Sequence, residues 1–191
     1  MSADTATAKP DAAKAPKKFE VPLALVAILI AAGAIGYFAA FVVGRDSGID
    51  GGLAVGEVAP ELTAAGWLNG EPQPVQGNVT VVNGWFYNCP HCWTEAPELA
   101  ALSEQFEGRS VQFVGLSPEA PESIEQVKDF VAKNGLKYPN GYGAIPTLQA
   151  FEVRAFPALW VLDRDGTVIW NRSLEHRESL EDAINRALAK S

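Results

Sequence analysis

Four consecutive residues, Cys89-Pro90-His91-Cys92, carry the strongest chemical signal in this 191-residue chain, which has two cysteines and two histidines in all. At the start of a helix, residues i and i+3 lie on one side, within the separation that a disulfide requires. The unpaired N–H groups of that helix end favour an anion, so a thiolate at Cys89 would be stabilised as a nucleophile. Pro90 suits the first helical turn. Cys92, one turn further in and more buried, can resolve a mixed disulfide, so the motif fits thiol–disulfide exchange.

Other uses of the two cysteines are open but less favoured. A structural disulfide across so short a loop would stabilise the fold little, because the entropic gain grows with loop length. An inert pair would not need a Pro-His insert at a helix start. A metal site would need more ligands, and a soft copper site built from Cys89, Cys92 and His176 is the main alternative outside thiol chemistry.

The elements that must hold the motif alternate along the chain. A buried strand at Val79–Tyr87 precedes it, and the apolar spacing of Cys89–Phe106 predicts a helix after it. The alternation predicts an α/β fold with a central mixed sheet, helices on both faces and an N-terminal β-hairpin. The other expected elements are strands at Val111–Leu116, Ala158–Leu162 and Thr167–Trp170, helices at Ser123–Asn134 and Ser179–Ala189, and a hairpin joining Leu62–Leu68 to Gln73–Val75 through Asn69-Gly70.

The N-terminal region has the pattern of a membrane anchor. Pro22 to Val43 is an uncharged run of 22 residues, and a helix of that length spans about 33 Å, enough for a hydrocarbon core of roughly 30 Å. The run is longer than the apolar part of a cleaved signal peptide. Four lysines precede it, which places the N-terminus in the cytoplasm and the rest outside. We therefore expect a tail at 1–20, a transmembrane helix at 21–43, a linker at 44–56 and one domain at 57–191.

The charge balance excludes one class of partner. The chain has a net charge of −8, and the part after Gly44 carries 11 basic and 20 acidic residues, a net charge of −9. Nucleic-acid binding requires clustered lysine and arginine, so nucleic acid is not expected as a partner.

Three stretches, Asn83–Leu99, Val58–Leu62 and Ala155–Gly166, resemble the TlpA/ResA/CcmG group of membrane-anchored, extracytoplasmic thioredoxin-like proteins. The resemblance covers nearly all of residues 57–191. It implies a thioredoxin-like fold and a thiol:disulfide oxidoreductase without a cofactor. It also implies extracytoplasmic protein thiols or disulfides as substrates and a membrane or periplasmic redox partner.

The same resemblance implies roles for individual residues. Cys89 would be the attacking thiol and Cys92 the resolving one. Glu95 matches a carboxylate found near the cysteine pair, and one turn beyond Cys92 it could exchange a proton with that thiol; the alternative is an ordinary surface glutamate. Substrate contacts would come from Trp85, Phe156 and Pro157, with a cis bond before Pro157.

The motif and the resemblance point to opposite directions of electron flow, because the Pro90-His91 dipeptide is that of DsbA-type oxidants whereas the anchored group mostly supplies reducing power. An imidazole at His91 could stabilise the Cys89 thiolate, although it could also be an exposed turn residue. Each unit by which the Cys89 pKa falls favours the reduced protein by about 1.4 kcal/mol, and a protein that prefers to be reduced is an oxidant. We expect a Cys89 pKa below about 8.5 and a potential more oxidising than that of a cytosolic thioredoxin.

Peroxide reduction is the weakest alternative. Peroxiredoxins share the fold, but their reactive cysteine is preceded by threonine or serine at −3 and by proline at −7. Those positions are Phe86 and Val82 here, so the motif disfavours this chemistry.

Overall fold

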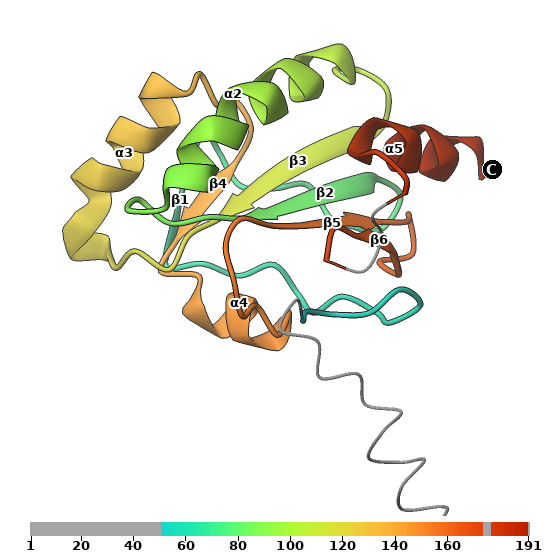
Figure 1. Ribbon diagram of the computed structural model, residues 1–191, viewed down its shortest axis with the longest axis horizontal. Coiled ribbons are helices and arrows are strands. Elements are labelled where there is room, and N and C mark those ends of the chain that lie inside the picture. The colour runs from blue at the N-terminus through green and yellow to red at the C-terminus, as the bar shows by residue number, and fades with distance from the viewer. Residues whose placement is uncertain (1–50, 174–176, 191) are drawn as a thin grey trace, which may run out of the picture. The chain divides into compact units, whose positions relative to one another are not determined.

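The computed structural model describes residues 51–173 and 177–190, and in this part of the chain six strands form one sheet in the order β1-β4-β3-β2-β5-β6 (Figure 1). The strands are β1 (Gly66–Leu68), β2 (Val79–Gly84), β3 (Val111–Leu116), β4 (Asn140–Tyr142), β5 (Ala158–Leu162) and β6 (Val168–Asn171). The helices are α2 (Pro90–Gln105), α3 (Ile124–Lys133), α4 (Ile145–Ala150) and α5 (Leu180–Ala189), with a 3-10 turn at Pro121–Ser123.

The sheet is mixed, as the sequence predicts. β2 is parallel to β3 and antiparallel to β5, and β3 is parallel to β4. Every residue of β2 is buried. Gly84, the last residue of β2, lies opposite Leu116 of β3 and Ala158 of β5. The chain that leaves β2 therefore emerges next to the start of β5.

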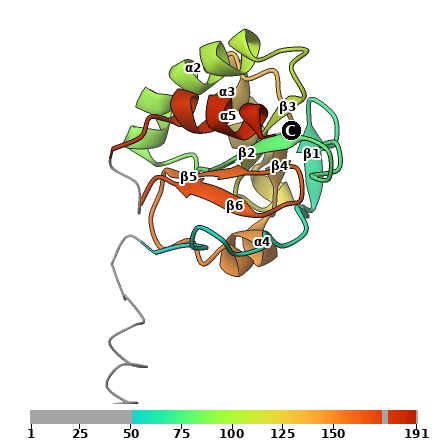
Figure 2. The ribbon, with the colours of Figure 1, turned by 90° about the vertical axis from the view of Figure 1, so that its right-hand side faces the viewer.

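Helices cover both faces of the sheet, in unequal number. Figures 1 and 2 show α2, α3 and α5 on one side of the sheet and α4 on the other. The first side holds a core cluster that includes Trp85, Leu99, Phe130 and Ile184. The opposite side holds a second cluster around Trp160. Two filled cores fix the sheet from both sides, so the end of β2 is a rigid base for the residues that follow it.

The predicted N-terminal hairpin is wrong. Asn69 and Gly70 do form a turn, with φ of 63° and 89°, but β1 pairs antiparallel with β4 instead of with Gln73–Val75. Prolines at 72 and 74 lack the N–H that a ladder needs. The Asn69 side chain instead donates to the carbonyl oxygens of Leu136 and Tyr138, at 2.7 and 3.2 Å. These contacts fasten the turn to the segment that leads into β4.

The end of the expected linker is hydrogen-bonded to the domain. Leu53 N–H donates to Phe151 O at 3.0 Å, and Leu53 O accepts from Trp160 Nε1 at 3.2 Å. Gly56 N–H donates to Val168 O at 2.8 Å. The expected tail and transmembrane helix at residues 1–43 lie outside the described residues. Within 51–173 and 177–190, no helix has the length and apolar character needed to cross a membrane.

Candidate active site

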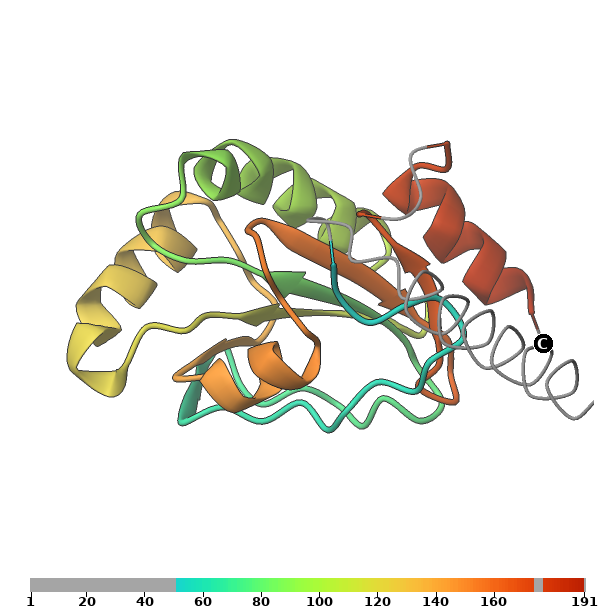
Figure 3. The ribbon, with the colours of Figure 1, turned by 60° about the horizontal axis from the view of Figure 1, so that its bottom comes forward.

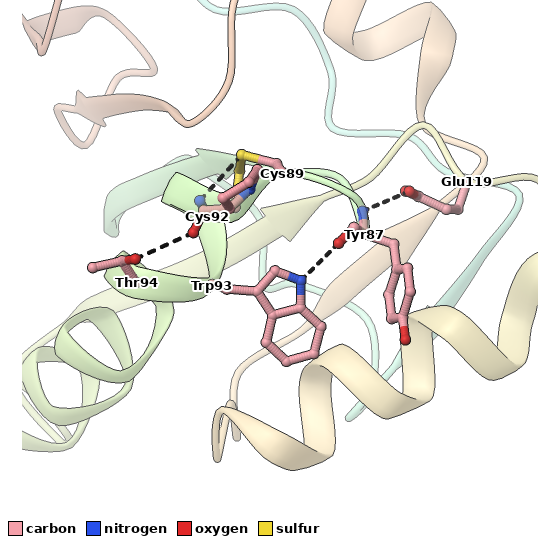
Figure 4. The surroundings of a disulfide bond; sticks show 7 residues. Tyr87, Cys89, Cys92, Trp93, Thr94 and Glu119 are labelled. Atoms are coloured by element: carbon pink, nitrogen blue, oxygen red, sulfur yellow. Dashed lines mark hydrogen bonds between the residues drawn. A yellow bond between two sulfur atoms is a disulfide. The ribbon is translucent and has the colours of Figure 1, made fainter.

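Cys89 and Cys92 form a disulfide at the junction of β2 and α2 (Figure 4). Cys89 is the N-cap of α2, Pro90 follows in the first turn, and the Cα atoms of the two cysteines are 5.2 Å apart. The backbone N–H of Cys92 donates to Cys89 Sγ at 3.1 Å. The sulfur of Cys89 thus faces the unpaired N–H groups of the helix start, where negative charge is stabilised. The two residues are about equally buried, at 3% and 2% exposure, so Cys92 is not clearly the more buried one.

The loop before Cys89 is fixed by hydrogen bonds to three other elements, and Figure 4 draws the bonds of Tyr87 with Glu119 and with Trp93. Tyr87 N–H donates to Glu119 Oε1 at 2.6 Å, and Tyr87 O accepts from Trp93 Nε1 at 2.6 Å. The Tyr87 hydroxyl donates to Asp129 Oδ2 at 3.0 Å, and Lys133 Nζ donates to the same oxygen at 2.9 Å. Contacts from the β3–α3 loop, α2 and α3 therefore hold the loop that leads to Cys89 in one conformation.

The hydrogen bonds among Tyr87, Asp129 and Lys133 favour one protonation state for each of these side chains. The bond from Lys133 is the main cause that lowers the pKa of Asp129 below its ordinary value of 3.8. The bond to Asp129 raises the pKa of both Tyr87 and Lys133. Tyr87 and Lys133 therefore stay donors and Asp129 stays an acceptor through the neutral range.

Trp85 is a core residue, and the prediction that it contacts substrate does not fit its position. It is completely buried. Its ring stacks on Phe130, with centroids 3.9 Å apart and planes 11° apart. Its Nε1 donates to Asn140 Oδ1 at 3.1 Å. A Cβ at Gly115 would collide with that amide oxygen, so a glycine is needed beneath this bond. Trp85 positions the loop that carries Cys89 instead of meeting a substrate.

Phe156 and Pro157 lie directly before β5. The bond between them is cis, and the Phe156 ring contacts Phe86 edge-on at 5.3 Å between centroids. Figure 3 shows the segment that joins α4 to β5 passing the loop between β2 and α2. The ring contact confirms that the two segments, distant in sequence, are neighbours.

Two hollows flank Pro157, and together they form what we call the docking groove. The first has a volume of about 390 Å³ and the second about 240 Å³, and both are bordered by Pro157 and Arg172. The first is also lined by His91, Thr94, Glu95 and Glu98 from α2. A larger hollow of about 560 Å³ is lined by residues 58–62, 71–76, Trp67 and Gly166. No part of the cysteine motif lines it, so the groove beside Pro157 is the better candidate for substrate.

Glu95 is partly buried and ion-paired, unlike an ordinary surface glutamate. Its Oε1 contacts the Arg172 guanidinium, and its side chain is 13% exposed. Its Oε2 is buried and has no hydrogen-bond partner among the described residues, and the same holds for Asn83 Oδ1 and the Tyr138 hydroxyl. Burial raises the pKa of Tyr138, the neighbouring Asn83 side chain opposes this, and the charge of Glu95 adds to the rise. A neutral tyrosine hydroxyl and an amide thus lie in the polar surroundings of the carboxylate.

Sequence reasoning missed Arg172, Tyr138 and the α3 contacts of Tyr87. Arg172 had a usable signal, because it follows the second strand of the predicted β5–β6 hairpin. Antiparallel pairing returns that position to the start of β5, and Arg172 N–H donates to Leu159 O at 3.1 Å. Tyr138 and Asp129 gave no comparable signal, since their contacts depend on tertiary packing.

The copper alternative is not tested by the structure. Among the described residues, no group of three or more histidine, cysteine, aspartate or glutamate side chains is arranged to hold a metal ion. His176, the third ligand of that hypothesis, lies outside the described residues. His91 is exposed on the first turn of α2 and lines the docking groove.

The sheet order, the cis-proline and the disulfide at the helix start define the chain as a thioredoxin-like thiol:disulfide oxidoreductase. Residues 55–171 match the model of the AhpC/TSA family, and the chain belongs to that family. It is similar to the thiol-disulfide oxidoreductase ResA of Bacillus anthracis, with 26% identity over 162 residues that cover 80% of this chain and 87% of ResA. ResA of Halalkalibacterium halodurans is 23% identical over 154 residues, covering 80% and 85%.

Solved structures confirm the fold. The thioredoxin domain of a thiol-disulfide oxidoreductase from Bacteroides vulgatus superimposes with a TM-score of 0.58 at 22% identity, covering 70% of this chain and 95% of that domain. A thiol:disulfide interchange protein from Bacteroides sp. gives 0.57 at 21% identity, covering 72% and 90%. The predicted thioredoxin-like α/β fold and the resemblance to ResA-like proteins are therefore confirmed.

Proposed function

We propose that the chain exchanges disulfides with extracytoplasmic proteins, held at the membrane by residues 21–43 with its N-terminus in the cytoplasm. One observation carries the chemical part of the proposal. The Cys89–Cys92 disulfide caps α2 next to a groove bordered by a cis-proline. The similarity to ResA, a thiol-disulfide oxidoreductase, supports the reaction class, and the uncharged N-terminal run supports the location.

In the reducing direction, the Cys89 thiolate attacks one sulfur of a substrate disulfide. A mixed disulfide forms and the second substrate sulfur leaves as a thiolate. The Cys92 thiolate then attacks Cys89 Sγ, which releases the first substrate sulfur and forms the Cys89–Cys92 disulfide. Two electrons pass to the substrate, and each released substrate thiolate takes up a proton. The oxidising direction is the reverse of these steps.

Glu95 supplies the proton chemistry in this proposal. It follows Cys92 by three residues on α2, so the two side chains lie on one face of the helix. Its Oε2 is buried and free of other hydrogen-bond partners among the described residues. As a carboxylate it accepts the Cys92 proton when that thiol becomes a nucleophile, and it returns the proton when the thiol re-forms.

The docking groove would receive the substrate chain. Pro157 and Phe156, both half-buried, would border the approach to the disulfide, and the backbone before Pro157 would offer an extended edge for a bound segment. The groove also contains His91, which we propose stabilises the Cys89 thiolate and makes the couple more oxidising than a cytosolic thioredoxin.

A trapping experiment tests the reaction class. In the Cys92→Ala variant, Cys89 should stay joined to a disulfide substrate such as insulin, because the resolving thiol is absent. The Cys89→Ala variant is the matched control and should form no adduct. Insulin reduction by the parent chain with dithiothreitol should exceed that of either variant. Equal adducts from both variants would contradict the assignment of Cys89 as the nucleophile.

The location is tested separately. Alkaline phosphatase fused after Ser191 should be active in a bacterial host with normal export, because the enzyme folds outside the cytoplasm. An inactive fusion would contradict the proposed topology and leave the reaction class untouched.

A further inference from the structure

Arg172 lies where the docking groove, the end of β6 and the Glu95 carboxylate meet. Its backbone is fixed, because its N–H donates to Leu159 O of β5 at 3.1 Å. Its guanidinium contacts Glu95 Oε1 and remains 40% exposed. It also borders both hollows beside Pro157. A cation is therefore held between the substrate groove and the carboxylate that follows the cysteine pair.

The ion pair constrains the orientation of Glu95. With Oε1 turned toward Arg172, Oε2 is the oxygen that is buried without a hydrogen-bond partner among the described residues. A carboxylate that is 13% exposed loses much of its hydration, and the ionised form then depends on a compensating charge. Arg172 supplies that charge and leaves Oε2 available for a proton.

The other charged and titratable groups around Glu95 do not replace this contact. His91 and Glu98 lie on the same helix and line the same hollow, where Glu98 brings like charge. Tyr138 approaches from the segment before β4, and its raised pKa keeps its hydroxyl neutral. Cys92 is held in the disulfide. In the described part of the chain, Glu95 forms its ion pair with Arg172.

We propose that Arg172 is a positioning residue for the thiol chemistry, which keeps Glu95 ionised and directs its inner oxygen toward the proton exchanged with Cys92. This inference rests on the proposed role of Glu95. Arg172 lies at the end of the β5–β6 hairpin, on a different element from Glu95. It would connect the docking groove with the carboxylate that moves the proton.

The test compares Arg172→Gln and Arg172→Lys in the full chain, using the rate at which iodoacetamide alkylates the reduced cysteines as a function of pH. Loss of the guanidinium should move the midpoint of the profile upward by roughly one pH unit, because the carboxylate that accepts the thiol proton loses the cation that orients it. Lysine keeps the charge and should restore at least half of the shift. Arg186→Gln is the matched control, since Arg186 is also 40% exposed and pairs with Glu178, and it should leave the profile unchanged.

A second comparison separates action through Glu95 from a direct effect on the thiols. In a Glu95→Gln background, Arg172→Gln should cause no further shift, because the group through which it acts is gone. An equal shift in both backgrounds would overturn the proposal, as would an unchanged profile for Arg172→Gln alone. Alkylation needs no protein substrate. If the parent fails to reduce insulin while the predicted shifts appear, the proposed function fails and the role of Arg172 stands.

Discussion

The backbone N–H of Cys92 donates to Cys89 Sγ at 3.1 Å, so the proposed nucleophile is also the cap of its own helix. The same helix start therefore uses one sulfur atom in two ways. The sulfur accepts a hydrogen bond from an otherwise unpaired N–H group of the first turn. The helix start in turn stabilises negative charge on that sulfur when the disulfide opens.

Capping predicts a difference between two variants that both lack the disulfide. Serine is a strong N-cap and alanine is a poor one, so Cys89→Ser should be more stable than Cys89→Ala by about 0.5–2 kcal/mol. Urea denaturation of the two proteins measures this difference directly. Both should be inactive in insulin reduction. Coincident denaturation midpoints would show that the residue at 89 contributes nothing as a cap.

Trp85 should affect stability and leave substrate binding unchanged. Trp85→Phe keeps an aromatic ring against Phe130 and removes the bond to Asn140, which leaves a buried amide oxygen without its donor. The expected loss of stability is about 1–3 kcal/mol. The KM for insulin should stay within twofold of the parent value. A large rise in KM with unchanged stability would restore Trp85 to the substrate site.

The Asp129 contacts predict a pH dependence of folding. Because the folded-state pKa of Asp129 lies below its ordinary value of 3.8, its contribution to stability is complete above that value. The contribution is lost as the pH falls through the lower folded-state pKa. Asp129→Asn should therefore be less stable than the parent near pH 7, and the gap should close on acidification below about pH 4.

Glu125→Gln is a suitable control for that experiment, because Glu125 makes an exposed ion pair with Lys128 on the same helix. Its effect should be small at every pH. Thermal unfolding of the three proteins from pH 2 to 7 gives the comparison. A gap between Asp129→Asn and the parent that persists at pH 2 would contradict the assigned cause.

Glu95→Gln should flatten the pH dependence of cysteine alkylation without unfolding the protein, because the amide cannot accept the Cys92 proton. Circular dichroism checks the fold of the variant. An unaltered alkylation profile would leave Glu95 with a structural role only, as the ion-pair partner of Arg172.

His91 tests the direction of electron flow. His91→Ser removes the imidazole from the turn between the cysteines and should raise the Cys89 pKa, which makes the couple more reducing. Equilibration of each protein with glutathione buffers measures the change. A variant with the potential of the parent would assign His91 to the exposed surface alone.

Local signals explain most of the successful predictions. The start of α2 is set by Cys89 and Pro90, and the largely apolar segment Val111–Leu116 gives β3 without error. β4 and α4 were not predicted, because they are short and depend on distant partners. Ser117 N–H donates to Gly141 O at 2.8 Å, and Ala144 N–H donates to Ser117 O at 2.9 Å, contacts that no local pattern encodes.

The predictions for the site divide in the same way, into those that a motif supports and those that depend on tertiary packing. The two cysteines and the cis bond before Pro157 followed from motif and resemblance, and the structure confirms the disulfide and the cis bond. The burial of Trp85 and the ion pair between Glu95 and Arg172 required the packing of elements far apart in the sequence.

The reduction potential of the Cys89–Cys92 couple is the most direct test of the central claim. The full chain would be equilibrated with graded mixtures of reduced and oxidised glutathione, and its free thiols counted after acid quenching. We predict one reversible two-electron transition between about −270 and −120 mV, the interval from a reducing thioredoxin to a strong periplasmic oxidant. A pair that stays oxidised throughout, with a potential below about −300 mV, would mark a structural disulfide and contradict the account.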